Sequence, residues 1–311
     1  MKVLFVDKES FFPSLGIAWF SAYLRKAGHD VGLKVLKGRV DWRDVKADPP
    51  DMLCYLFATG EHDYYQQVNA GIRMTLETMG HTIVSVFAGS YVTKFPEYIR
   101  GQYMDIGVRG EGYEAIVDIA NALRDKEPLI GIPNTVMAGQ VNLSRPLLNK
   151  DTMLYPDRDL MYRCKRSRSN PIKNVLCSFD QAGHVEIRPV GEVMGEIEDV
   201  LRFPLDMLCF QDGIFPVCNE EWMDMFCTEY PKHCDKSFHI QTHPAFINDV
   251  IKAVRRLEQH DISVSVTFDA PGTKRYDRLQ KLLAVASKSR LARALLPAVT
   301  HLSYRQLYKV A

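Results

Sequence analysis

Closely spaced cysteines are missing from this sequence of 311 residues. It contains seven cysteines and no CxxC pair. An odd number of thiols without paired spacing argues against a disulfide framework, and it leaves metal binding and packing in a core as interpretations. The seven are Cys54, Cys164, Cys177, Cys209, Cys218, Cys227 and Cys234.

Long apolar runs and an excess of charge are missing as well. No run approaches the ~18 residues of a membrane span, and the first residues, MKVLFVDKES, reach charged side chains too early for a signal peptide. The formal net charge of +1 at pH 7 gives no electrostatic reason to expect nucleic acid or an anionic membrane as a partner. No GxxxxGK[ST], GxSxG or HExxH motif occurs. We therefore expect a cytoplasmic protein that binds neither nucleic acid nor a membrane.

The first 130 residues alternate between apolar strands and amphipathic helices. The predicted strands cover residues 2–7, 31–38, 51–60, 81–90 and 104–110. Alternation of this kind is typical of a doubly wound parallel sheet with helices on both faces. We therefore predict an α/β protein whose N-terminal domain, residues 1–130, is Rossmann-like.

The rest of the chain divides into a linker and a second α/β domain. Residues 131–170 are rich in proline and have little periodicity, which predicts a β-hairpin and a linker. From residue 171 the alternation resumes for about four βα units. A closed barrel of eight units needs ~250 residues, so we predict a truncated, partial (βα) barrel over 171–311.

Small residues lie near the carboxyl ends of the first-domain strands. Ligands of open parallel sheets bind outside these ends, where the strand order reverses. Small side chains there let a flat or bulky ligand approach the backbone, and a helix N-terminus attracts phosphate or amide oxygens. The same residues also permit tight strand–helix turns, so both interpretations stay open. The candidates are Ser14, Gly16, Ala58, Thr59, Ala88, Gly89 and Ser90.

Four segments of the sequence carry a resemblance to a known family. They are "PSLGIAWFSAYLRKAGHDV", "FAGSYVTKFPEYI", "DIGVRGEGYEAIVDIANAL" and "RPLLNKDTMLYPDRDLMY", in this order. Together they resemble the cobalamin-binding-domain radical S-adenosylmethionine proteins, a class that includes methyltransferases and the anaerobic cyclase of bacteriochlorophyll synthesis. The resemblance implies that the first domain is of the cobalamin-binding type. It adds Leu15, Gly110, Glu111 and Gly112 to the candidate cofactor contacts.

The histidine that ligates cobalt in the Asp-x-His-x-x-Gly signature is absent, because the loop "VDKESFFPSLG" contains none. In the resembling class this ligand is commonly missing and cobalamin is held without it. His62 is the one histidine near a predicted strand end in this half. We interpret it as a solvated residue of a polar loop.

The resemblance also implies a CxxxCxxC motif after the first strand of the second domain, where three thiolates would hold a four-iron cluster. The segment "NPIKNVLCSFDQAGHVEIRP" has a single cysteine, Cys177, which we place within the strand and in the core. The loop "DQAGHVE" after it is too short to wrap a cluster. Cys218 and Cys234 could meet in loops, but a metal site there is the less favoured interpretation. The acidic run of Glu192, Glu196, Glu198 and Asp199 predicts a solvent-facing helix surface.

Three hypotheses about function remain. The leading one is a protein that binds cobalamin, or a related tetrapyrrole, and serves a partner enzyme or paralogue, without a cluster or S-adenosylmethionine. The second is a cobalamin-dependent radical S-adenosylmethionine methyltransferase whose cluster is ligated in an atypical way. The third is a cofactor-free scaffold or partner subunit. The missing cluster cysteines favour a protein that is not itself an enzyme, and the sequence alone does not decide among the three.

Overall fold

The computed structural model forms two compact units, Met1–Arg168 and Ser169–Ala311. It describes residues 1–10, 14–37, 41–58, 60–100, 103–146, 153–162, 170, 172–181, 184–212, 215–217, 219–242 and 246–268. The part of the predicted (βα) domain after residue 268 lies outside the described residues. Within those residues, no helix is long and apolar enough to cross a membrane.

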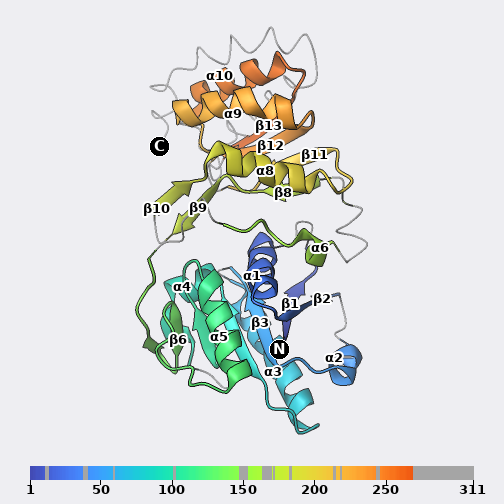
Figure 1. Ribbon diagram of the computed structural model, residues 1–311, viewed down its shortest axis with the longest axis vertical. Coiled ribbons are helices and arrows are strands. Elements are labelled where there is room, and N and C mark those ends of the chain that lie inside the picture. Colours follow the sequence, from blue (N-terminus) through green and yellow to red (C-terminus); the bar gives the residue numbers. More distant parts are fainter. Residues whose placement is uncertain are drawn as a thin grey trace. The chain divides into compact units, whose positions relative to one another are not determined.

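The first unit is built on a seven-stranded sheet with the order β2-β1-β3-β4-β5-β6-β7 (Figure 1). Neighbours from β2 to β5 pair in parallel, and the last two pairs are antiparallel. The strands are β1 (Lys2–Lys8), β2 (Asp30–Leu36), β3 (Met52–Leu56), β4 (Val84–Ala88), β5 (Ile106–Val108), β6 (Thr135–Met137) and β7 (Gln140–Val141). The strand order reverses between β1 and β3, and this is where ligands of such sheets bind.

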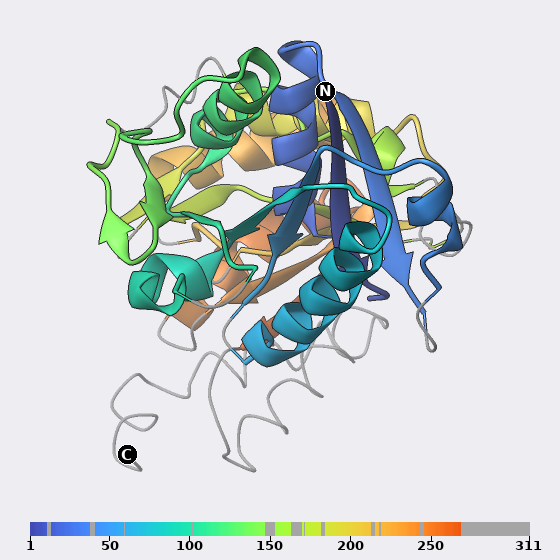
Figure 2. The ribbon, with the colours of Figure 1, turned by 90° about the horizontal axis from the view of Figure 1, so that it is seen from below.

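Helices cover both faces of this sheet, with α1 and α5 on one face and α3 and α4 on the other (Figure 2). An apolar cluster joins α3 to the sheet through Tyr65, Ile72, Tyr55 and Phe87, all of which are buried. The helices are α1 (Leu15–Lys26), α2 (Arg43–Ala47), α3 (His62–Glu77), α4 (Ser90–Lys94), η1 (Pro96–Tyr98) and α5 (Tyr113–Asp125). The predicted α/β class, with a predominantly parallel first sheet, is confirmed.

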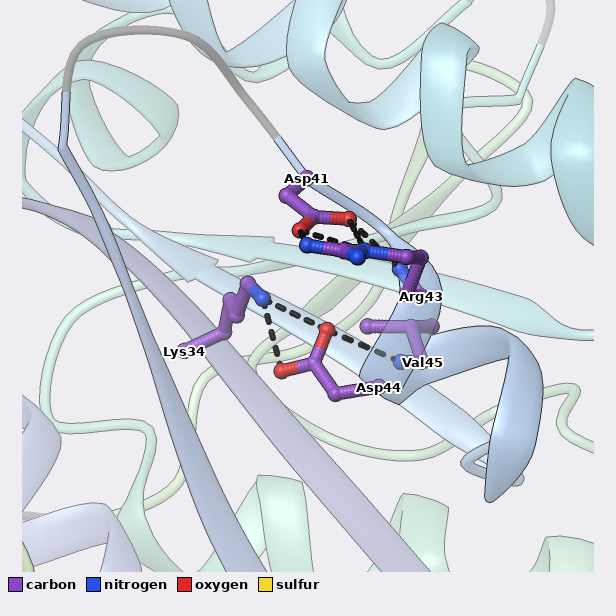
Figure 3. Close-up of polar contacts among 5 residues, drawn as sticks. All are labelled: Lys34, Asp41, Arg43, Asp44 and Val45. Atoms are coloured by element: carbon purple, nitrogen blue, oxygen red, sulfur yellow. Dashed lines mark hydrogen bonds and ion pairs between the residues drawn. The ribbon is translucent and has the colours of Figure 1, made fainter.

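The short helix α2 was not anticipated from the sequence. Two ion pairs hold it, one between Lys34 Nζ and Asp44 at 2.5 Å and one between Arg43 and Asp41 at 2.6 Å (Figure 3). The side chain of Val45 enters the core. A helix of a single turn is too short to show a periodic pattern in the sequence. It is recognised in the structure by its contacts.

The segment that follows α5 packs against the first unit. The strands β6 and β7 form the expected hairpin and extend the sheet. Further on, Trp19 Nε1 donates to Leu154 O at 2.9 Å, and Ser21 Oγ donates to Asp157 Oδ2 at 2.6 Å. Asp157 also accepts from Leu160 N and so caps α6 (Arg158–Met161). These contacts fix residues 153–162 on α1.

The second unit contains a four-stranded parallel sheet with the order β13-β12-β11-β8. A single apolar cluster joins these strands to the three helices. The elements are β8 (Ile172–Val175), α8 (Val190–Val200), β11 (Met207–Phe210), α9 (Glu220–His233), β12 (Ser237–Thr242), α10 (Ile247–Glu258) and β13 (Val264–Phe268). Sequential parallel strands with helices between them agree with the predicted βα units.

A β-hairpin follows β8 where the sequence suggested a short loop. It consists of β9 (Ser178–Gln181) and β10 (His184–Ile187), which pair antiparallel. Cys177 lies at the bend between β8 and β9, so its placement within the strand is wrong. Its assignment to the core is confirmed, because the side chain is fully buried.

Candidate functional site

The predicted cofactor contacts gather at one edge of the first sheet. Each group follows a parallel strand, and the carboxyl ends of parallel strands meet at the same edge. Ala58, Ser90 and Gly110 are exposed there, whereas Leu15, Ala88 and Gly112 are buried; Ser14, Gly16, Gly89 and Glu111 are half-buried. Thr59 lies outside the described residues. We call this edge the carboxyl edge.

The N-terminus of α1 opens onto the carboxyl edge beside β1. Ser14 is its N-cap, but the serine side chain makes no capping hydrogen bond, and the first turn contains no acidic residue. The first backbone N–H groups of this helix therefore keep their partial positive charge. Such a helix end suits the amide or phosphate oxygens of a ligand.

A threonine connects the loops that follow β4 and β5. Thr93 Oγ1 donates to Gly89 O at 3.0 Å and accepts from Gly110 N at 3.0 Å. A single hydroxyl thus fixes two of the predicted contact segments relative to each other. This rigidity would preorganise the carboxyl edge for a ligand.

The glycines of the carboxyl edge fall into two kinds. A Cβ atom on Gly89 would lie 2.2 Å from Phe57 O, and one on Gly112 would lie 1.9 Å from Val108 Cγ1. Packing therefore explains these two glycines without a ligand. A Cβ on Gly110 would meet no atom within 4 Å, although its φ of +60° favours glycine. The open space at Gly110 is the kind that a ligand could fill.

Buried polar groups lie beneath the carboxyl edge, where β1 and β3 diverge. Tyr65 OH donates to Asp7 Oδ1 at 2.7 Å. Next to this buried pair, the solvent-exposed Lys8 forms an ion pair with the partly exposed Glu61. Burial raises the pKa of Asp7 above its ordinary value, against the lowering effect of the Tyr65 hydrogen bond. Asp7 as a whole is 9% exposed, and the backbone N–H of Lys8 also hydrogen-bonds its carboxyl group.

His62 is the first residue of α3 and not a solvated loop residue. Its ring stacks on Tyr91, with centroids 4.4 Å apart and an angle of 2° between the planes. The ring of Tyr98 meets it edge-on at 5.4 Å. The placement of His62 in a polar loop is therefore wrong, although its side chain is still 28% exposed. Its aromatic neighbours lie about 30 residues further along the chain, so local polarity could not reveal them.

In the second unit, a buried carboxylate anchors the hairpin that follows β8. Asp212, which is 3% exposed, accepts from Cys177 N at 2.9 Å and from Ser178 N and Ser178 Oγ at 2.5 and 2.7 Å. Burial raises the pKa of Asp212 to about 6, although these hydrogen bonds lower it. Asp212, which follows β11, therefore fixes the backbone of the segment that follows β8.

A buried ion pair stands beside this anchor. Arg188 donates to Glu196 and, at 2.8 Å, to Leu176 O, and the two charged side chains are 2% and 0% exposed. Glu196 was expected on a solvent-facing surface, and that expectation is wrong. Its partner, Arg188, precedes the first residue of α8, so the helical pattern of the sequence does not pair the two residues. Glu198, in contrast, is 58% exposed and pairs with His233.

The thiols of the described residues are buried. They are Cys54, Cys177, Cys209, Cys227 and Cys234, and none forms a disulfide. In the described part of the chain, no group of three or more histidine, cysteine or acidic side chains is arranged to hold a metal ion. Cys218 lies outside the described residues, so a site shared by Cys218 and Cys234 stays an untested prediction.

A polar row crosses the second sheet and was missed in the sequence. Asn174, Cys209, His239 and Ser265 are register partners on four neighbouring strands, so their side chains share one face. Parallel sheets are usually apolar on both faces. His239 Nδ1 lies 2.9 Å from Ser265 Oγ, and burial lowers the pKa of this histidine. Burial raises the pKa of Cys209 to about 11. The row is therefore uncharged near neutral pH.

The raised pKa of Asp212 predicts a pH dependence of stability. The folded state keeps a proton between about pH 4, the unfolded value, and about pH 6, the folded value. The stabilising contribution is thus full below pH 4 and lost as pH rises through 6. In the variant Asp212→Asn this loss, about 2–3 kcal/mol over two pH units, should disappear from the urea-unfolding free energy. Asp206→Asn, at an exposed acid of the same unit, should follow the parent profile. Parallel profiles of Asp212→Asn and the parent would contradict this expectation.

Among solved structures, the fold is similar to those of cobalamin-dependent S-adenosylmethionine radical enzymes. OxsB with aqua-cobalamin and S-adenosylmethionine bound matches with a TM-score of 0.66 and 12% identity over 92% of this chain and 47% of that chain. The methyltransferase TsrM from Kitasatospora setae, with cobalamin and a [4Fe-4S] cluster bound, matches with a TM-score of 0.62 and 12% identity over 92% of this chain and 70% of that one. At such identities the likeness shows the fold alone. The chain spans about half the length of OxsB. No protein-family model and no curated protein matches it.

Proposed function

We propose that this chain binds a corrinoid, cobalamin or a related tetrapyrrole, at the carboxyl edge of its first unit. The observation that carries this proposal is the parallel pairing of β1 to β5, because the carboxyl ends of parallel strands meet at one edge. The strand order reverses at this edge between β1 and β3, where ligands of such sheets bind. The structural likeness to enzymes solved with cobalamin bound supports the same ligand.

The residues at the carboxyl edge suit such a group. A corrin ring is large and flat, and its periphery carries amide side chains. Ala58, Ser90 and Gly110 leave its approach open, and the uncapped N-terminus of α1 presents N–H donors for amide oxygens. When bound, a corrinoid would supply cobalt chemistry, and the chain's residues would position it and exclude water.

We further propose that the second unit does not assemble a four-iron cluster. After its first strand the chain forms a hairpin, which Asp212 anchors through the backbone of Cys177 and Ser178. The thiol at this position is fully buried in the apolar cluster. A core thiol next to a fixed hairpin is not placed to serve as a cluster ligand. The chain would then carry or present its corrinoid to a partner enzyme or paralogue.

Binding of hydroxocobalamin tests the first proposal. Protein incubated with it and desalted should retain the visible spectrum of the corrinoid. The variant Ser90→Trp, which adds bulk at an exposed position of the carboxyl edge, should weaken binding roughly 5- to 150-fold, because overpacking costs about 1–3 kcal/mol. Equilibrium dialysis gives the affinity.

The matched control is Thr82→Trp, another exposed position, which lies before β4 at the opposite end of the strands. It should bind like the parent. Loss of binding in both variants would show a general effect of tryptophan, and absence of binding by the parent would refute the proposal.

The likeness to TsrM, over 70% of that chain, keeps one alternative open. In it, the chain is a cobalamin-dependent radical methyltransferase whose cluster is ligated in an atypical way. Anaerobic reconstitution decides between the two proposals: stoichiometric iron and sulfide that are lost in Cys218→Ala or Cys234→Ala would establish the alternative, and iron at background level would exclude it. A chain that retains neither corrinoid nor iron but forms a stable complex in native mass spectrometry would be a scaffold.

A further inference from the structure

A cavity of about 420 Å³ lies between α9 and α10, two helices of the second unit that pack against each other (Figure 1). Its volume falls within the range of about 300–1,000 Å³ that is typical of small-molecule sites. The nonpolar part of its lining consists of Val217, Met223, Cys227 and Ala253. A second cavity, of about 460 Å³, shares Cys227 and Arg256 with the first, so the two adjoin. The space between these helices is therefore large enough for an apolar group of the size of a large side chain.

The two helices contribute opposite charges to this cavity. Its charged lining consists of two acids of α9 and four charged residues of α10, which are Glu220, Asp224, Asp249, Lys252, Arg255 and Arg256. Lys252 Nζ lies 3.4 Å from Glu220 Oε1, and Arg256 pairs with Asp224. The side chains of these two pairs are 42–81% exposed, and exposed ion pairs contribute little to stability. They can therefore exchange their partners for the charged groups of a ligand at little cost.

We propose that this cavity binds a free α-amino acid with a large apolar side chain. The carboxylate of the ligand would pair with Arg256 or Lys252, and its ammonium group with Asp224 or Glu220, so that every charge keeps a partner. Cations and acids already lie in contact here, as the two charged groups of an α-amino acid do. The apolar side chain would leave water for the nonpolar part of the lining. A compound with a single charge would deprive one helix of its partner without replacing it.

Methionine methyl groups give a direct test. Met223 lines the cavity, whereas Met225 is 47% exposed on the same helix and is not among the lining residues. In the full chain with carbon-13-labelled methionine methyl groups, titration with L-phenylalanine should shift the Met223 signal saturably, through the ring current, and leave the Met225 signal unmoved. The variants Met223→Leu and Met225→Leu assign the two signals. Phenylpropionate and phenylethylamine, which each lack one charged group, should bind up to about fivefold more weakly than phenylalanine.

Three variants complete the test. Ala253→Leu, which fills the cavity, should abolish the Met223 shift, and Asn248→Leu, at an exposed position of α10 outside the lining, should keep it. Asp224→Asn, at an exposed side chain, leaves the packing unchanged and should reduce the preference for phenylalanine over phenylpropionate, because a partner of the ammonium group is lost. An unmoved Met223 signal in the parent, equal shifts of Met223 and Met225, or equal affinities for the three compounds would overturn the proposal. Each of these results is independent of corrinoid binding, because the cavity lies wholly within the second unit.

Discussion

Replacing Glu196 by alanine should destabilise the second unit by about 3–5 kcal/mol, the cost of breaking a buried ion pair by removing one partner. Glu196 is fully buried and is paired with Arg188. Without it the guanidinium keeps its bond to Leu176 O but loses the buried carboxylate with which it is paired. Hydrogen–deuterium exchange of α8 and β8 in a urea series measures the loss within this unit, whatever the first unit does.

Two further variants show whether the buried charge causes the effect. Glu198→Ala, on the same helix but 58% exposed, should cost less than about 1 kcal/mol. The double variant Arg188→Met with Glu196→Leu should recover most of the lost stability, because apolar residues of similar size often replace buried ion pairs without loss. Equal costs for Glu196→Ala and Glu198→Ala would contradict the role assigned to the pair.

The architecture could be predicted from the sequence to the extent that it depends on local patterns. Apolar segments ending at small or acidic residues marked the five parallel strands of the first sheet, and the rule for their carboxyl ends marked the candidate edge. The five-residue helix α2 and the hairpin after β8, whose strands have four residues each, were missed because such short elements show no clear period. Burial of Glu196 was missed for a different reason. A run of acidic residues predicts solvent exposure, because a carboxylate is rarely buried without a partner. The fold supplies such a partner, Arg188, and the sequence pattern does not show it.

The candidate site divides in the same way. The sequence placed small residues at the carboxyl edge, but it could not separate those required by packing from those that leave room. Gly89 and Gly112 have neighbours that a Cβ would overlap, and Gly110 has none. The sequence also could not reveal the environment of His62, which depends on aromatic rings from the segment after β4. Contacts between distant segments decide both questions.

Gly89→Ala should cost the first unit about 3 kcal/mol or more. Its φ of 110° and ψ of −176° lie in a region that is essentially restricted to glycine. The added Cβ would also lie 2.2 Å from the backbone oxygen of Phe57, which cannot turn aside as a flexible side chain could. Either β4 or the loop after β3 must shift, and the stack of Phe57 on Tyr65, with centroids 5.3 Å apart, would be disturbed. Hydrogen exchange of β3 and β4 in a urea series measures this loss.

Gly110→Ala separates the clash from the backbone strain. Gly110 also has a positive φ, but a Cβ there meets no atom within 4 Å. This variant should therefore pay the conformational cost alone, about 1–2 kcal/mol. The difference between the two variants measures the overlap with Phe57 O. If the two variants lose the same amount of stability, Gly89 lies further from the loop after β3 than the structure shows. The small residue would then be available to a ligand and would not be fixed by packing.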